Sequence, residues 1–247
     1  MATYQAAETI KEQKPKAADQ YLENSVERFQ ETMKILEPEF SRLKDPVIYD
    51  IGGYGYLTGL IKKKTGFARV YDVSCADLNT LQLEVEDGSA DVVLLCEVIE
   101  HLYNPDAVMR ECRRILKKGG ALVLTTPNLS SWFNRILLVL GFFPMNQDIS
   151  CRLRVSGRRD ILSKRPMPDA DFNPLFDVHV RLYNIRTLEL LMEEWGFRPA
   201  GAASYIVWDS SHHKISALLG LANRFFGRFP TLAQGLIVKA AAVSNRK

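Results

Sequence analysis

Two hydrophobic periodicities divide the chain, and the change from one to the other marks its organisation. From Ala17 to Leu43 the apolar residues recur at helical spacing, which predicts a helical lead-in that breaks or kinks near Glu37, before Pro38. From residue 47 onward, short apolar runs are separated by amphipathic segments. Alternation of this kind predicts strands and helices in turn, and therefore a doubly wound α/β sheet.

The expected elements follow in a simple order. The apolar runs that predict strands are VIYDI, ARVYDVS, ADVVLLC, ALVLTT, AGAASYIVW and GLIVKAAAV. The helical segments between them are YLTGLIKKK, NPDAVMRECRRILKK and TLELLMEEWGF, with a further helical stretch before the last strand. Asn104 and Pro105 suit the start of the second helix, and Gly119 and Gly120 suit its end. The last two strands are expected to form an antiparallel hairpin at the sheet edge.

One long interruption suggests the domain organisation. The alternation stops after Pro127 and resumes near residue 179, so we expect a cap inserted at about 129–178. The chain then consists of a helical lead-in over 1–46 and one α/β domain over 47–247, which is an ordinary size for such a domain.

Composition and charge narrow the class of protein. Of 247 residues, 47% are hydrophobic and 25% are charged, the balance of a soluble globular protein. A net charge of +3 is too small to indicate nucleic acid. The start of the chain lacks the apolar core of a signal peptide, and the most apolar stretch, ILLVLGFFPMNQ, is shorter than the ~20 residues of a membrane span. The four cysteines form no C-x-x-C pair, so we expect no metal motif and a cytoplasmic setting.

The stretch YDIGGYGYLTGLIKKK, beginning at Tyr49, indicates a ligand site. A strand that ends in an acid, turns on glycines and enters a helix presents backbone N–H groups to anionic or polar ligands. In nucleotide-binding folds, an acid ~20 residues further on accepts the ribose hydroxyls. Asp72 and Asp77 are the candidates here. Taken alone, a glycine-rich turn is equally consistent with a plain tight turn.

The segment DGSADVVLLCEVIEHLYNPDAVMRECRRILKKGGALVLTTPN adds a family resemblance. It closely resembles the class I S-adenosylmethionine-dependent methyltransferases, in the small-molecule branch that includes ubiquinone-biosynthesis and envelope-glycan enzymes. In that branch FDxVxxxEVxEHxxxP and RxLKPGGxLxxxxPN mark the fourth and fifth strands and the helix between them. The resemblance covers residues 47 to 128 and 179 to 200. It implies a Rossmann-like fold, S-adenosylmethionine as cofactor, and methyl transfer to a small or lipid-linked acceptor, at oxygen rather than nitrogen or carbon.

The resemblance also implies a role for each matching residue. The methionine end of the cofactor would be held by Asp50, Gly52, Gly53 and Gly55, and the ribose or adenine by Asp72 or Asp77. Glu97 would face both cofactor and substrate after the fourth strand, and Glu100 and His101 would lie near the substrate. Pro127, Asn128 and His179 would line the substrate side.

His101 and Glu97 are the expected catalytic pair. Histidine has a pKa near working pH, which suits a general base, and chemistry in open α/β sheets lies at the carboxyl ends of strands. If the chain enters a helix directly after Cys96, these two residues share one helix face. The competing interpretations are a histidine that only caps the helix, a solvated Glu100, and a polar loop residue at His179.

Two features depart from the family pattern. The turn reads D-x-G-G-x-G, one residue shorter than D-x-G-x-G-x-G, and Asp50 to Asp91 is too short for a full second crossover. Either the second crossover helix is lost, or the second strand runs straight into DLNTLQLEVEDG, which we favour. A shortened turn leaves open a competing function, a degenerate methyltransferase fold that serves as a binding or scaffold protein.

The inserted segment carries the expected substrate preference. SSWFNRILLVLGFFP is apolar, and CRLRVSGRRDILSKRP holds six basic residues and one acid. Together with the amphipathic, basic ALLGLANRFFGRF, they favour an anionic lipid-linked substrate or peripheral contact with the inner membrane face. The alternative is a folded cap with a solvated basic face. Nucleic acid is not favoured, because the basic residues adjoin aliphatic rather than spaced aromatic residues.

Overall fold

The computed structural model describes residues 15–52, 55–73, 78–79, 82–150, 178–205 and 221–243, with side chains from Ser25 onward. The elements over these residues run in the order α2 Pro15–Arg42, β1 Ile48–Ile51, α3 Tyr56–Thr65, β2 Val70–Val73, β3 Ala90–Cys96, the 3-10 turn η1 Ile99–His101, α4 Pro105–Ile115, β4 Leu116–Pro127, α5 Trp132–Val139, α7 Ile185–Glu194, β5 Phe197–Tyr205 and β6 Gly235–Ala242. A helical turn over 221–226 precedes β6.

The strands form one six-stranded sheet in the order β2-β1-β3-β4-β6-β5 within the described residues. The first four are parallel, and β6 runs antiparallel between β4 and β5. In β3 every side chain but that of Asp91 is buried, as expected for a central strand covered on both faces. The predicted doubly wound Rossmann-like sheet and its C-terminal antiparallel hairpin are confirmed.

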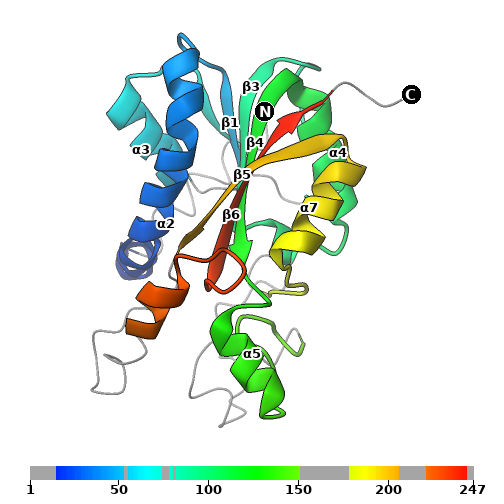
Figure 1. Cartoon of the computed structure of the whole chain (residues 1–247). Coiled ribbons are helices and arrows are strands. Elements are labelled where there is room, and N and C mark those ends of the chain that lie inside the picture. The colour runs from blue at the N-terminus through cyan, green and yellow to red at the C-terminus, as the bar shows by residue number, and fades with distance from the viewer. Residues whose placement is uncertain are drawn as a thin grey trace.

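Helices cover both faces of this sheet, with α2 and α3 on one side and α4 and α7 on the other (Figure 1). On the first face, Phe29, Met33 and Leu36 of α2 join α3 and alternate residues of the strands in one apolar core. On the second face, buried residues of α4 and α7 form the other core. The predicted lead-in helix is therefore an integral layer over the sheet, and the parallel strands all point their carboxyl ends toward α5.

The predicted break near Glu37 and the predicted helix end at Gly119 and Gly120 are wrong, and the alternative of a kink at Pro38 stays a prediction. Helix α2 continues through Pro38, because Met33 and Leu36 before the proline and Phe40 after it pack in the same core, which outweighs one missing backbone hydrogen bond. Gly119 and Gly120 do not end α4. Leu116 is already extended and its N–H donates to the carbonyl of Cys112, so both glycines belong to the start of β4.

The crossover from β2 to β3 contains no helix over the described residues 78–79 and 82–89, which form turns and bends. The continuation of β2 that the sequence favoured is likewise not seen at these positions. Leu78 and Leu83 are buried in the place of a crossover helix. Arg114 secures this segment by donating to the carbonyls of Leu83 and Val85 at 2.9 and 2.7 Å.

The predicted cap begins with α5, and its residues 151–177, including the basic run, lie outside the described part of the chain. Trp132 of α5 stacks on Phe226 with ring centroids 5.4 Å apart, and its Nε1 donates to Asn223 Oδ1 at 2.8 Å. The start of the cap is thus joined to the segment before β6. Within the described residues, no helix combines the length and apolarity required to cross a bilayer.

Candidate active site

Two glycines flanking the turn after β1 have a backbone conformation that favours glycine. Gly52 and Gly55 have φ values of 77° and 75°, in the left-handed region that favours glycine. A Cβ at Gly52 would lie 2.8 Å from Val98 Cγ2, so a side chain there would collide with the segment after β3. Gly53 lies outside the described residues. Gly55, the N-cap of α3, thus places a residue without a side chain at the N-terminus of that helix.

Asp72 lies beside this turn, as the sequence predicted for a ribose ligand. It is paired in register with Asp50 on the neighbouring strand. A Cβ at Gly55 would be 3.2 Å from the Asp72 carboxylate oxygen Oδ2, so glycine leaves room for that carboxylate. The other candidate, Asp77, lies outside the described residues.

Asp50 is completely buried at the end of β1. Its Oδ2 accepts a hydrogen bond from Thr58 Oγ1 at 3.0 Å, and its Oδ1 has no hydrogen-bond partner within the described structure. Burial is the main cause that raises the pKa of this carboxyl to about 7; the hydrogen bond from Thr58 opposes the shift, and the charge of Asp72 adds to it. A buried oxygen without a partner needs a donor, and a bound ligand can supply one.

Glu97 adopts a left-handed conformation, φ 55°, directly after β3. Its Oε1 accepts hydrogen bonds from Thr125 Oγ1 at 2.9 Å and Tyr205 Oη at 2.5 Å. Its Oε2 lies 3.2 Å from a guanidinium nitrogen of Arg28, which is also buried. Burial first, and then the charge of Glu97, raise the pKa of the Tyr205 hydroxyl. Glu97 therefore connects α2, β4 and β5 at the edge of the site.

Sequence reasoning missed Arg28, Thr125 and Tyr205 as partners of Glu97. Arg28 lies in the lead-in helix, and nothing in the helical pattern distinguishes it from a solvated basic residue. Its guanidinium lies over the rings of Phe29 and Tyr205, 5.1 and 6.0 Å from their centroids. These contacts join segments that are far apart in the chain, so local sequence carries no signal for them.

Glu100 is fully buried rather than solvated, which corrects the alternative considered from the sequence. Its Oε2 accepts from Thr126 Oγ1 at 3.0 Å, and its Oε1 has no hydrogen-bond partner within the described residues. Burial, and next the charge of Glu97, raise the pKa of Glu100 well above its ordinary value. Its backbone carbonyl accepts from the N–H groups of Val180 and Arg181.

His101 in η1 and His179, which follows the predicted cap, lie side by side. Their ring centroids lie 4.6 Å apart with an interplanar angle of 71°. His101 Nδ1 is 3.0 Å from the carbonyl of Val178, and His179 Nδ1 is 2.6 Å from that of Asn146. The chain enters only the short turn η1 after Glu97, so the shared helix face expected for Glu97 and His101 is not formed.

Asn128 has protein partners for its whole side chain. Its Nδ2 donates to the carbonyls of Pro230 and Ala233 at 3.1 and 2.8 Å, and its Oδ1 accepts from Ser130. It holds the segment before β6 against the end of β4. These contacts favour a structural role over the predicted substrate contact. Pro127, predicted beside it, ends β4 and pairs with Gly235.

Comparisons with known proteins agree on one family. The family described as a methyltransferase domain matches residues 54–124. A probable S-adenosylmethionine-dependent methyltransferase of Mycobacterium tuberculosis is 41% identical over 56 residues, 23% of this chain and 20% of that protein. The ubiquinone biosynthesis O-methyltransferase of Idiomarina loihiensis is 35% identical over 81 residues, 31% of this chain and 33% of that protein.

Solved structures match along most of the chain. A complex between the Trm112 methyltransferase activator of Haloferax volcanii and a putative methyltransferase matches with a TM-score of 0.55 at 14% identity, covering 92% of this chain and 96% of that chain. The chain therefore has the fold of these methyltransferases, and its residues 54–124 match the methyltransferase-domain family. An S-adenosylmethionine-dependent methyltransferase from Archaeoglobus fulgidus matches this chain with a TM-score of 0.50 at 14% identity, over 90% and 98% of the two chains. The curated alignments span only 20% and 33% of the relatives' lengths, so they do not identify an acceptor.

Proposed function

We propose that this methyltransferase moves a methyl group from S-adenosylmethionine to a hydroxyl oxygen of a small or lipid-linked acceptor. The observation that carries the proposal is the glycine turn between β1 and α3. Gly52 and Gly55 have left-handed backbone, and Asp50 presents a buried oxygen without a described partner behind them. Such a turn suits the amino-acid end of the cofactor, whose ammonium group can donate to a buried carboxylate.

The cofactor side would be held by residues from two strand ends. Asp50, Gly52 and Gly55 would hold the methionine end, with Gly53 between them, and Asp72 or Asp77 would accept the ribose hydroxyls. S-adenosylmethionine supplies a methyl group already activated by a positively charged sulfur. The protein's task is then to align the acceptor oxygen with that methyl group, exclude water, and remove the hydroxyl proton.

His101 is the favoured group for contact with the acceptor. A carbonyl oxygen can only accept a hydrogen bond, so the contact with Val178 places a proton on Nδ1 and leaves the lone pair of a neutral ring on Nε2. That tautomer suits a base or a ligand toward the substrate. His179 adjoins it through the ring contact and carries the same tautomer by its contact with Asn146.

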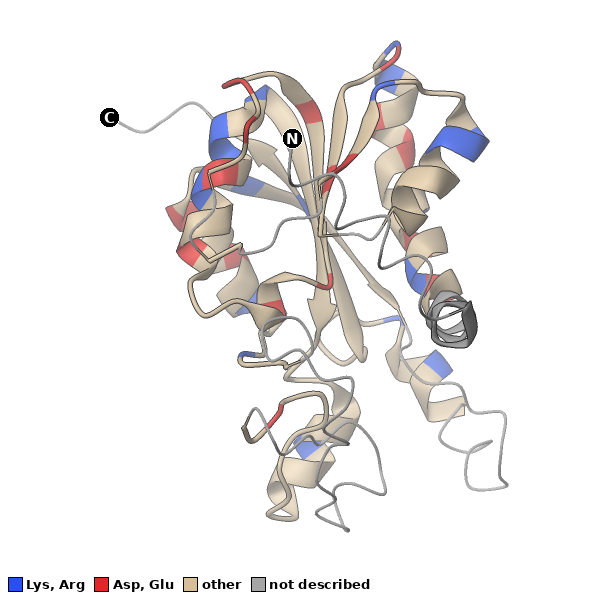
Figure 2. Ribbon diagram, turned by 180° about the vertical axis from the view of Figure 1, so that it is seen from behind, with Lys and Arg blue, Asp and Glu red and all other residues tan. Residues whose placement is uncertain are grey.

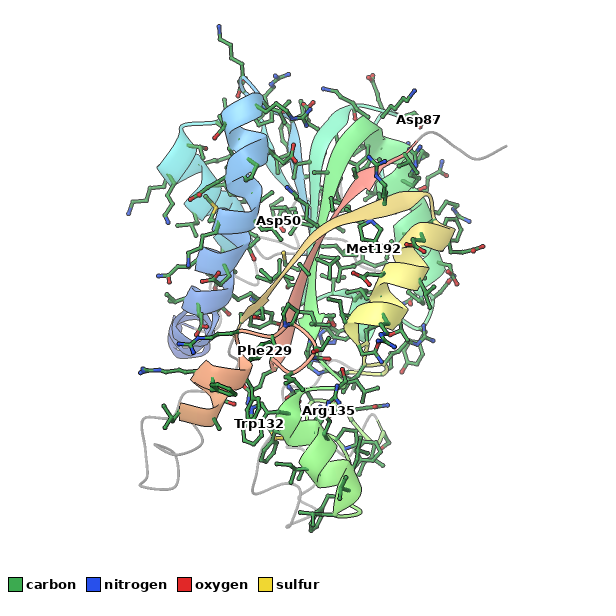
Figure 3. All side chains as sticks on the ribbon, in the orientation of Figure 1. Asp50, Asp87, Trp132, Arg135, Met192 and Phe229 are labelled. Carbon is green, nitrogen blue, oxygen red and sulfur yellow. The ribbon has the colours of Figure 1, made fainter. Side chains whose placement is uncertain are left out.

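An exposed apolar surface supports a lipid-linked acceptor. Its residues are Ile136, Leu138, Val139, Leu140, Phe142, Phe143, Leu221, Phe225 and Phe229, all exposed large hydrophobic side chains. Trp132 and Arg135 of α5 and Phe229 lie at the same end of the molecule (Figure 3). The described part of this end carries few charged residues (Figure 2), and those exposed on α5 and on residues 221–229 are Arg135, Arg224 and Arg228. We call the set of hydrophobic residues the apolar tip, and contiguous surfaces of this kind mark sites of protein, ligand or membrane contact.

Calorimetric titration with S-adenosylhomocysteine tests the proposal, followed by transfer of labelled methyl groups to lipid, glycan and quinol acceptors. We expect saturable binding at one site and transfer to a hydroxyl-bearing acceptor. Absence of binding would favour the competing function, a methyltransferase fold that serves as a binding or scaffold protein. Binding with transfer only to nitrogen or carbon acceptors would contradict the assignment to oxygen.

A further inference from the structure

Tyr205, the last residue of β5, contacts the Glu97 carboxylate from the C-terminal hairpin. Its Oη donates to Glu97 Oε1 at 2.5 Å, and its side chain is buried. We propose that Tyr205, packed against Gly235, is a positioning residue that fixes Glu97 beside the positively charged sulfur of S-adenosylmethionine. The inference rests on the proposed function, because it takes the cofactor to lie at the glycine turn.

Gly235 makes room for the tyrosine ring. The two residues are cross-strand partners in the antiparallel pair of β5 and β6. A Cβ at Gly235 would overlap the Tyr205 ring at Cζ, Cε1 and Cε2. The backbone of Gly235 does not have a positive φ, so the ring, and not the backbone conformation, is what excludes a side chain there. A glycine inside a strand often marks such a close approach.

The hydroxyl of Tyr205 acts as a donor. Burial first, and then the charge of Glu97, raise the pKa of this hydroxyl well above its ordinary value, so the proton stays on the oxygen at neutral pH. A buried tyrosine hydroxyl usually has a hydrogen-bond partner, and a short bond to a carboxylate is one of the stronger kinds. The position of the ring therefore determines where the carboxylate oxygen lies.

Glu97 needs this support because of its backbone conformation. A φ of 55° is uncommon for a residue other than glycine and costs free energy. The Glu97 N–H donates to the Thr125 carbonyl at 3.0 Å. Its carboxylate is bonded to Thr125, Tyr205 and Arg28. Three elements, β4, β5 and α2, thus fix one side chain, and residues held in this way are concentrated at functional sites.

Glu97 lies between the glycine turn and η1. Strand β3, which it follows, pairs with β1, and the next residue, Val98, lies close to Gly52 in the turn. The chain then enters η1, which ends at His101. Despite its three partners, the Glu97 side chain is 18% exposed, whereas that of Arg28 is 7% exposed. Part of the Glu97 side chain therefore remains accessible to a ligand.

The sulfur is the part of the cofactor that suits this place. Its methyl group must point toward the acceptor, and the methionine end is already assigned to Asp50 and the turn. The sulfur is positively charged in S-adenosylmethionine and neutral in S-adenosylhomocysteine, and a fixed carboxylate favours the charged form. Arg28 lies on the Oε2 side of Glu97, and Oε1 has only hydroxyl partners. Glu97 held by Tyr205 should thus favour the methyl donor over the product.

Calorimetry with S-adenosylmethionine and with S-adenosylhomocysteine tests the inference without an acceptor. In Tyr205→Phe, which loses only the hydroxyl, the affinity for S-adenosylmethionine should fall more than about fivefold relative to that for S-adenosylhomocysteine. The matched control is Tyr183→Phe, because Tyr183 is also buried but lies in the core on the other face of the sheet. Both affinities should be unchanged in that control.

A purely structural role of Tyr205 would affect both ligands alike. Equal loss of the two affinities in Tyr205→Phe, or an unchanged ratio between them, would therefore overturn the proposal. Thermal unfolding checks that each variant is folded.

Two further variants show whether Tyr205 acts through Glu97. Gly235→Ala keeps the hydroxyl but displaces the ring, so it should shift the ratio in the same direction. Gly201→Ala on β5, where a Cβ meets nothing within 4 Å, should not. If Gly235→Ala does not fold, Tyr205→Phe decides alone. In a Glu97→Gln background, Tyr205→Phe should change the ratio no further, and a full additional change would contradict the positioning role.

The two proposals fail in different ways. If the wild-type protein binds neither ligand, the proposed function fails and this inference fails with it. If the wild type binds both ligands and the ratio stays the same in Tyr205→Phe, only the positioning role fails and the cofactor site remains.

Discussion

Arg28 of the lead-in helix and Glu97 after β3 form an ion pair of 3.2 Å across the interior of the protein. Both side chains are largely shielded from water, and the guanidinium also lies over the ring of Tyr205. The pair fixes α2 to the end of the sheet where we place the site. A helix that sequence reasoning treated as a separate lead-in therefore holds a residue of the predicted catalytic pair.

Replacing Arg28 by Met should destabilise the protein strongly. Removing one partner of a buried ion pair leaves the other charge uncompensated, which costs about 3–5 kcal/mol. The matched control is Arg42→Met on the same helix, because Arg42 pairs with Glu39 at 2.7 Å while its side chain is 61% exposed, and exposed pairs contribute about 0–1 kcal/mol. Urea unfolding measures both. Equal losses of unfolding free energy in the two variants would show that the Arg28–Glu97 pair stabilises the protein no more than an exposed pair does.

Gly52→Ala should weaken S-adenosylhomocysteine binding by about tenfold or more, which corresponds to roughly 1.4 kcal/mol. The new Cβ would be 2.8 Å from Val98 Cγ2, at a backbone φ of 77° that alanine rarely adopts. Calorimetry on folded protein gives the affinity.

The matched control is Gly59→Ala in α3, where a Cβ meets nothing within 4 Å. Alanine is a better helix former than glycine, so this variant should keep its affinity and unfold at the same or a higher temperature. If Gly52→Ala binds as tightly as Gly59→Ala, the ligand does not lie at this turn.

Each of the six apolar runs predicted from the sequence corresponds to a strand of the sheet. The local signal is strong in β3 and β6, which are largely buried. Strands β2 and β5 are largely exposed and were indicated by their place in the alternation. The helix break mispredicted near Glu37, before Pro38, and the helix end mispredicted at Gly119 and Gly120 depend on what packs on either side. There the apolar core decides the outcome, and local propensity is overridden.

The candidate site was predicted only where a local motif exists. The glycine turn, Asp50 and Asp72 lie on neighbouring strand ends, so strand order alone brings them together. Burial of Glu100 and the pairing of Arg28 with Glu97 depend on contacts between distant parts of the chain. From the sequence alone, a charged residue in a helical pattern is predicted to be exposed to solvent. The approach of His179 to His101 depends on how the cap returns to the sheet, which no local periodicity describes.

Stability should depend on pH through Asp50. Its pKa is raised from 3.8 to about 7, chiefly by burial. Between these values the folded state keeps a proton that the unfolded chain has released, so the free energy of unfolding falls as pH rises from about 4 to about 7. Asp50→Asn removes the titrating carboxyl, and with it this pH dependence, while its amide oxygen can still accept the hydrogen bond from Thr58.

Urea unfolding of both proteins at pH 5 and pH 7 gives the comparison. The variant should gain stability relative to the wild type as pH rises, while other titrating groups, such as Glu100, contribute to both proteins and cancel. If the free energy of unfolding changes equally in both proteins between pH 5 and pH 7, the pKa of the Asp50 carboxyl is not raised by folding.

The apolar tip should bind lipid bilayers. Leu140 of the tip and Leu190 on α7 are both 64% exposed. The two leucines therefore match in residue type and exposure and differ only in their position on the surface. Leu140→Ser should therefore reduce binding to phospholipid vesicles, while Leu190→Ser should not, and neither change should alter the unfolding temperature by much. Sedimentation with vesicles measures the bound fraction.

Charge should add to this attraction, because Arg135, Arg224 and Arg228 are exposed beside the tip and basic residues near a bilayer favour anionic lipids. Binding should be tighter with anionic than with neutral vesicles, and added salt should weaken only the difference between them. Equal binding by the Leu140 and Leu190 variants would show that the tip is not the contacting surface. A preference for neutral vesicles would show that the arginines face away from the bilayer, and the lipid-linked acceptor would then lose its support from this surface.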